Sequence, residues 1–207
     1  MIDRSKNSGV RRLAVLALFT AIVIVLQMLG SFVRFGMFSV SLVLIPIVVG
    51  AALYGAWAGA WLGFVFSVAV LITDSAAFMV ISPLGTIITV LLKGTLAGFV
   101  TGLIYRPLSR TGVYLIVEAK AKERWRVDMG VAVSAVVCPV VNTGLFLLGC
   151  LCFFLPTIRE WGAAAGFENV GSYMILGLVG ANFLFEVLVN LILSPLIVRL
   201  VQIGKKR

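Results

Sequence analysis

Long apolar stretches separated by short polar segments limit most strongly how this chain can fold. The first covers residues 13–29 and the last residues 172–201, and each is long enough for a helix to cross a bilayer. Of the 207 residues, 61% are hydrophobic and only 12% are charged. A soluble core of this size cannot bury so much apolar surface, so we predict an all-α integral membrane protein.

Polar breaks divide the chain into six expected transmembrane helices within a single domain, residues 1–207. The helices are expected at approximately 12–30, 41–54, 56–74, 83–105, 128–155 and 172–202, with a hydrophilic loop at 106–127. The segments 74–82 and 156–171 are expected to be outer turns or loops. The second stretch is short for a crossing. Both chain ends are basic, however, so they should lie on the same side of the membrane, which requires an even number of crossings.

The distribution of charge predicts the orientation of the bundle. The net charge is +9, and all but three of the 17 Lys and Arg residues fall before the first helix, around the 106–127 loop or at the C-terminal end. This asymmetry is typical of cytoplasmic segments, so we expect both termini in the cytoplasm and no binding of nucleic acid. With no histidine and no paired-cysteine spacing, we expect neither a metal site nor a cofactor.

Three polar residues interrupt the last apolar stretch. Asn182, Glu186 and Asn190 are spaced by four residues, which places them on one face of a helix. An acidic residue at the centre of a membrane helix costs about 2.5–3.5 kcal/mol, and such residues usually face a bundle interior with a partner. The face is therefore either part of a functional site or a hydrogen-bond cluster that joins helices.

Polar residues on three expected helices fall at similar depths. A rise of 1.5 Å per residue places Lys93, Asn142, Asn182 and Glu186 about 14–20 Å from the outer helix ends, and Thr89 lies on the same side of its helix as Lys93. We predict a ligand-binding site in this layer. Lys93 and Glu186 are natural counter-charges, which either pair with each other or contact a ligand.

The segment 31–41 is rich in aromatic residues around one cation. Arg34 lies among phenylalanines that include Phe35 and Phe38, which indicates a loop at the outer interface. This loop either covers the ligand site or forms an aromatic belt with an anchoring arginine.

Small residues recur at helical spacing on several of the expected helices. Ala14, Ala17 and Ala21 form a stripe on the first helix, and glycines repeat every four residues at positions 55–63 and 94–102. Small side chains allow two membrane helices to approach closely. We expect the glycines to pack helices within the bundle, and the alanine stripe to let another helix approach closely.

Sequence motifs argue against catalysis and against a self-powered carrier. The chain has no histidine, phosphate-binding loop or nucleophile motif, so we expect it not to be an enzyme. Self-powered carriers commonly consist of internal repeats, and none is found here. A small binding bundle without a visible energy source is typical of a subunit of a larger machine.

Several short segments bear a family resemblance. They are ALFTA at 17–21, LIP at 44–46, GAWAG at 55–59, PVVNT at 139–143 and the Asn182 to Asn190 face. With them, nearly the whole chain resembles the substrate-binding S component of energy-coupling factor (ECF) vitamin transporters, which are six-helix proteins of prokaryotic cell membranes.

The resemblance implies a vitamin bound from outside, beneath the outer loops. It also implies a transmembrane coupling subunit that docks on the alanine stripe, and two cytoplasmic ATPases that power release. The vitamin stays open among pantothenate, riboflavin, folate, cobalamin and others. A self-contained carrier or channel and, less favoured, a membrane-embedded enzyme remain the alternatives.

Overall fold

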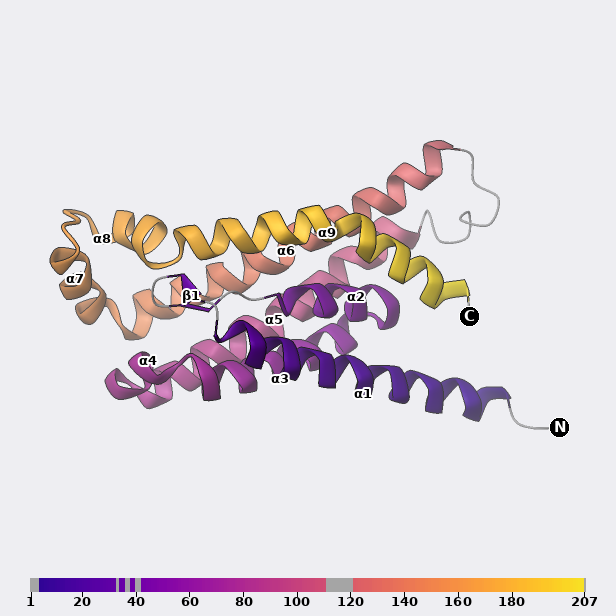
Figure 1. Ribbon diagram of the computed structural model, residues 1–207, viewed down its shortest axis with the longest axis horizontal. Coiled ribbons are helices and arrows are strands. Elements are labelled where there is room, and N and C mark those ends of the chain that lie inside the picture. The colour runs from indigo at the N-terminus through magenta and orange to yellow at the C-terminus, as the bar shows by residue number, and fades with distance from the viewer. Residues whose placement is uncertain (1–3, 33, 36–37, 40–41, 111–120, 207) are drawn as a thin grey trace.

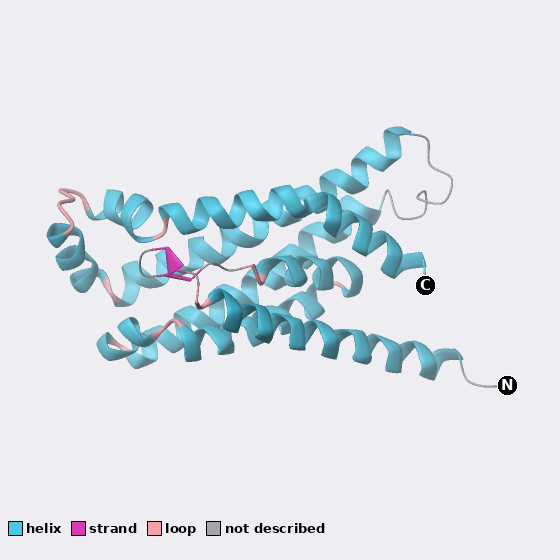
Figure 2. Ribbon diagram, viewed as in Figure 1, coloured by secondary structure: helices cyan, strands magenta, loops and turns pink. Residues whose placement is uncertain are grey.

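The chain is almost entirely helical. The computed structural model describes residues 4–32, 34–35, 38–39, 42–110 and 121–206 (Figures 1 and 2). Its helices are α1 Arg4–Gly30, α2 Leu44–Tyr54, α3 Ala56–Thr73, α4 Ala76–Ile81, α5 Pro83–Arg110, α6 Ala121–Phe153, α7 Leu155–Ala164, α8 Val170–Ser172, the π-helix η2 Tyr173–Leu178 and α9 Gly180–Lys206. The prediction of an all-α fold is confirmed.

The long helices run side by side as a bundle with two distinct ends. Figure 1 shows the start of α1 and the end of α9 at one end, together with the ends of α5 and α6 that flank residues 111–120. The short helices α4, α7 and α8 lie at the opposite end. The two chain ends therefore lie at the same end of the bundle, as an even number of passes requires.

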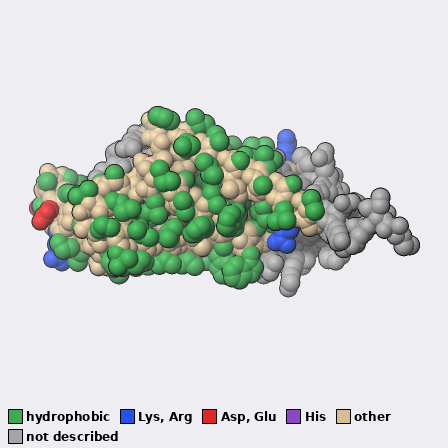
Figure 3. Space-filling view, turned by 90° about the horizontal axis from the view of Figure 1, so that it is seen from below, with side chains coloured by type: hydrophobic (Ala, Val, Ile, Leu, Met, Phe, Trp, Pro, Cys, Tyr) green, Lys and Arg blue, Asp and Glu red, His purple; other side chains and the backbone are tan. Residues whose placement is uncertain are grey.

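Four helices in the described residues are long and apolar enough to cross a membrane. They contain the spans Arg12–Gly30, Ala56–Thr73, Pro83–Tyr105 and Gly130–Phe153. The bent pair Val170–Leu178 and Gly180–Leu193 makes a fifth if it is counted as one span. In Figure 3, hydrophobic side chains cover the middle of the visible face, and the coloured charged groups lie toward its ends. This distribution fits a bundle surrounded by lipid.

The expected second crossing is the weakest part of the six-helix prediction. Its helix, α2, begins at Leu44 and has 11 residues, a length of about 17 Å against a hydrocarbon core of about 30 Å. The segment before it holds a small ribbon, β1 Arg34–Phe35 and β2 Phe38–Ser39, which pair antiparallel with Phe35 opposite Phe38. The count of six crossings therefore stays a prediction.

Two segments that we expected to be turns or loops contain helices. The segment 74–82 includes α4, and the segment 156–171 includes most of α7. Pro156 lies in the first turn of α7, where a proline needs no backbone hydrogen bond and favours the start of a helix. The expectation of irregular structure was wrong because polar residues mark these segments as interfacial without excluding short helices.

Glycines bring α3 and α5 into backbone contact. A methyl group at Gly59 would overlap the carbonyl group of Gly98, and one at Gly63 would overlap the carbonyl group of Gly94. In turn, a methyl group at Gly98 would overlap the carbonyl group of Gly59, and one at Gly94 would overlap that of Gly63. The predicted role of these glycines in packing helices within the bundle is confirmed.

The buried side chains form two hydrophobic clusters. The larger one joins residues of α1, α2, α3, α5, α6 and α9, including Phe66 and Val70. The smaller one joins α4, α6, α7 and η2 and includes Phe78, Phe146 and Val179. The candidate site described next has walls from both clusters, so it lies where the two meet.

Candidate ligand-binding site

The polar face of α9 forms a hydrogen-bonded ladder. Asn182 Nδ2 donates to Glu186 Oε1 at 3.0 Å, and Asn190 Nδ2 donates to the backbone carbonyl of Glu186 at 2.8 Å. Glu186 is 2% exposed. The prediction that these three residues share one helix face is confirmed, and the Asn182 amide holds the Glu186 carboxylate in place.

A break in the last span precedes this ladder. The π-helix η2 meets α9 at an angle of 47°, whereas the sequence predicted one continuous helix over 172–202. A methyl group at Gly180 would lie 2.7 Å from the backbone oxygen of Ile175, so a larger residue would disturb the bend. π-Helical turns are rare and occur frequently at functional sites. Here Val179 and Asn182, which flank Gly180, both line a cavity.

A cation from α5 lies beside an aromatic ring from α6. Lys93 Nζ is 5.1 Å from the centroid of Phe146, a cation–π distance. Asn142 lies one helical turn before Phe146 and is 5% exposed.

These groups surround a cavity of about 40 Å³. A water molecule needs about 10–15 Å³ of such space, so the cavity has room for several small polar groups. Its walls are Lys93, Asn142, Asn182 and Glu186, together with Phe66, Val70, Asp74, Thr143, Phe146 and Val179. The structure therefore brings together four of the residues selected from the sequence, and they come from α5, α6 and α9.

The remaining selected residues lie elsewhere. Thr89 lines a second, adjoining cavity of about 30 Å³ that also touches Lys93. The structure describes the backbones of Arg34, Phe35 and Phe38 in the ribbon but not their side chains. The three alanines, Ala14, Ala17 and Ala21, are exposed along α1 and line neither cavity.

Two residues that line the polar cavity have side-chain oxygens without a hydrogen-bond donor. Asn142 Oδ1 and Asn182 Oδ1 are buried and accept no hydrogen bond from the described part of the chain. A buried acceptor without a donor costs about 1–3 kcal/mol. These oxygens are therefore suited to a ligand that brings N–H or O–H groups, while the Lys93 ammonium is suited to a negatively charged group.

Asp74 is a wall residue that the sequence analysis missed. Its Oδ2 accepts hydrogen bonds from Gln27 Nε2 at 2.7 Å and from Thr73 Oγ1 at 3.0 Å. We assigned Asp74 to an outer turn because it directly follows an apolar stretch. A signal was present, since Gln27 near the end of the first apolar stretch requires a polar partner at the same depth.

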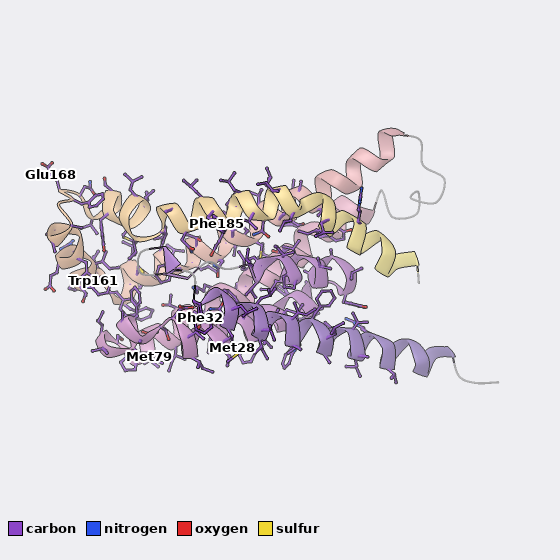
Figure 4. All side chains as sticks on the ribbon, viewed as in Figure 1. Met28, Phe32, Met79, Trp161, Glu168 and Phe185 are labelled. Carbon is purple, nitrogen blue, oxygen red and sulfur yellow. The ribbon has the colours of Figure 1, made fainter. Side chains whose placement is uncertain are left out.

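Aromatic side chains lie at the α4 and α7 end of the bundle. The ring of Phe78 makes edge contacts with Phe146, Phe154 and Trp161 at centroid distances of 5.6, 5.0 and 5.6 Å. Figure 4 shows Trp161 and Met79 at this end, with Glu168 at its tip. In the described residues, no group of three or more His, Cys, Asp or Glu side chains could hold a metal ion.

A family model identifies the class of protein. The model for the substrate-specific component of ECF transporters matches residues 11–198. The chain belongs to this family, so it is a multi-pass protein of the prokaryotic plasma membrane and a substrate-binding component for vitamin uptake. The family is one of transport components and not of enzymes, and the resemblance drawn from the short motifs is confirmed.

One curated relative has a named substrate. The chain is 30% identical over 204 residues to the pantothenic acid transporter PanT of Lactococcus lactis subsp. cremoris (strain MG1363), and the match covers 93% of this chain and 94% of that protein. No solved structure matches the chain.

Proposed function

We propose that this chain captures pantothenate outside the cell and presents it for import. The observation that carries the proposal is the buried polar cavity, which α5, α6 and α9 line with a cation, amides and a carboxylate. The pantothenic acid transporter that shares 30% of its residues supports this choice of vitamin.

The chemistry of pantothenate fits the cavity. Its carboxylate is a partner for the Lys93 ammonium, and such charge-assisted contacts are stronger than neutral hydrogen bonds. Its amide N–H and hydroxyl groups are donors for Asn142 Oδ1 and Asn182 Oδ1, which have no donor within the described residues. Glu186 Oε1 accepts a hydrogen bond from Asn182 Nδ2 and so fixes the direction of Asn182 Oδ1.

The ribbon before α2 is the proposed cover of the site. Arg34 and Phe35 lie on β1, and Phe38 lies on β2. In this role the aromatic side chains exclude water from the bound vitamin, and Arg34 adds a second cation to attract its carboxylate.

Import requires partners that this chain does not contain. In the proposed assembly, six crossings place both termini in the cytoplasm, a transmembrane coupling subunit docks on α1, and two cytoplasmic ATPases drive release. Ala14, Ala17 and Ala21 are exposed on α1, and only 17% of its span Arg12–Gly30 is buried. A surface of small side chains is suited to close contact with another membrane helix.

The test is direct binding by the purified full chain in detergent or nanodiscs. We expect mass spectrometry to find pantothenate among the molecules that co-purify, and calorimetry to show saturable binding of pantothenate but not of riboflavin. Vitamin uptake into cells or vesicles should then require the coupling subunit and ATP. Binding of a different vitamin would overturn the ligand, and uptake by the chain alone would overturn its role as a subunit.

A further inference from the structure

The polar cavity adjoins a second chamber whose walls have a different chemistry. The two spaces, of about 40 and 30 Å³, share Val70, Asp74, Lys93 and Phe146. We call the second space, which is also lined by Phe78, Thr89, Val90 and Phe154, the inner chamber. Because Lys93 borders both spaces, a molecule bound at its ammonium lies next to each of them.

The inner chamber is mainly apolar and has a fixed aromatic wall. Phe78 packs edge-on against Phe146 and Phe154 at centroid distances of 5.6 and 5.0 Å. Val90 and Phe154 are almost fully buried on its other sides. Such walls favour a compact aliphatic group, and a space of about 30 Å³ accommodates only a few groups the size of water.

One hydroxyl in this chamber is left without a hydrogen bond. The hydroxyl groups of Ser75 and Thr86 donate to the carbonyls of Leu71 and Ser82 at 2.6 and 2.8 Å. Thr89 Oγ1, by contrast, has no partner in the described part of the chain, although Thr89 is only 4% exposed. A methyl group at Gly149 would overlap the Thr89 side chain, so α6 confines this hydroxyl closely.

We infer that the inner chamber is a specificity subsite for the end of the ligand farthest from its carboxylate. It takes a short branched aliphatic group, and Thr89 Oγ1 hydrogen-bonds a hydroxyl on that group. This inference rests on the proposed function and narrows the substrate class to slender hydroxylated carboxylates without ring systems. A site that hydrogen-bonds a substrate hydroxyl discriminates strongly against the analogue that lacks it.

The test uses calorimetry to compare two ligands on the full-length wild type, on two variants of Thr89 and on one control variant. The ligands are pantothenate and N-(3,3-dimethylbutanoyl)-β-alanine, which keeps the carboxylate, the amide and the branched carbon but lacks both hydroxyls. We expect the wild type to prefer pantothenate by at least about tenfold. Thr89→Val should weaken pantothenate binding by about three- to tenfold and change binding of the analogue by less than twofold, whereas Thr89→Ser should keep the wild-type preference.

A matched control lies on the same helix. Thr101 is 0% exposed, donates its hydroxyl to the carbonyl of Ala97 at 2.6 Å and lines neither space, so Thr101→Val should leave the preference unchanged. Equal effects of Thr89→Val on both ligands, or no effect on either, would overturn the inference alone. Failure of the wild type to bind pantothenate would overturn both the inference and the proposed ligand.

Discussion

Gln27 Nε2 donates a hydrogen bond of 2.7 Å to Asp74 Oδ2, which fastens α1 to a wall of the candidate site. The same nitrogen donates to Thr73 Oγ1 at 3.1 Å, and Gln27 is 1% exposed. Most of the α1 span is not buried within the bundle. Near the end of the helix that bears the alanine stripe, the side chain of Gln27 therefore joins α1 to a wall of the cavity.

We predict that Gln27→Leu weakens both folding and binding. The change removes the donor to Asp74, and loss of one hydrogen bond to a buried charged group costs about 1–3 kcal/mol. We expect a lower unfolding temperature in detergent and a several-fold weaker affinity for pantothenate. The control is Met28→Leu at the neighbouring exposed position. Wild-type stability and affinity in Gln27→Leu would show that the contact with Asp74 is dispensable.

The contact between α3 and α5 should not tolerate even one methyl group. In Gly63→Ala, the new Cβ overlaps the backbone of Gly94, so the helices must move apart and folded yield should fall. Gly144→Ala is the matched control, because a Cβ there meets no atom within 4 Å. Size-exclusion chromatography with thermal unfolding measures both variants. Equal stability of the two variants would contradict the packing account.

The sequence predictions of shared faces and helix packing that the structure confirms rest on regular helical geometry. Spacing by four placed Asn182, Glu186 and Asn190 on one face, and it also identified the glycines of α3 and α5. Depth counted along three helices brought Lys93 and Asn142 to the same cavity, since helices of similar length in a bilayer place equivalent positions in one layer.

Features that depend on tertiary contact were not predictable in this way. The bend before α9 arises where a π-helical turn meets Gly180, and the apolar pattern of 172–201 continues through it unchanged. Asp74 is a wall residue because α1 and α3 pack together, and no local sequence pattern predicts that packing. The extended ribbon at Arg34 and Phe38 has a composition that also fits an interfacial loop.

The orientation of the bundle can be tested independently of ligand and family. In a protein whose Cys138, Cys150 and Cys152 are replaced by alanine, we predict that Ser109→Cys reacts with a membrane-impermeant maleimide only from the cytoplasm. Ala164→Cys should react only from outside. The reason is the concentration of basic residues near position 109. The opposite labelling pattern would invert the topology.

Large side chains on the alanine stripe should block docking of the coupling subunit without affecting ligand binding. We predict that Ala17→Trp with Ala21→Trp abolishes vitamin uptake and co-purification with the coupling subunit, because an approaching helix cannot accommodate the indoles. Pantothenate binding by the isolated chain should persist, since neither alanine lines a cavity. Ile22→Trp, exposed on another side of α1, is the control. Unchanged uptake in the double variant would favour a self-contained carrier.

The central claim is that the cavity beside Lys93 holds the vitamin. The most direct measurement is calorimetric affinity for pantothenate of Lys93→Met and Asn142→Leu, each confirmed as folded by size-exclusion chromatography and thermal unfolding. The control is Ser134→Ala, which removes a buried hydroxyl on α6 outside the cavity. We predict that both cavity variants bind at least about tenfold more weakly, as expected for loss of a charge-assisted contact or of a buried hydrogen bond, and that the control binds normally. Wild-type affinity in both folded cavity variants would contradict the account and place the site elsewhere.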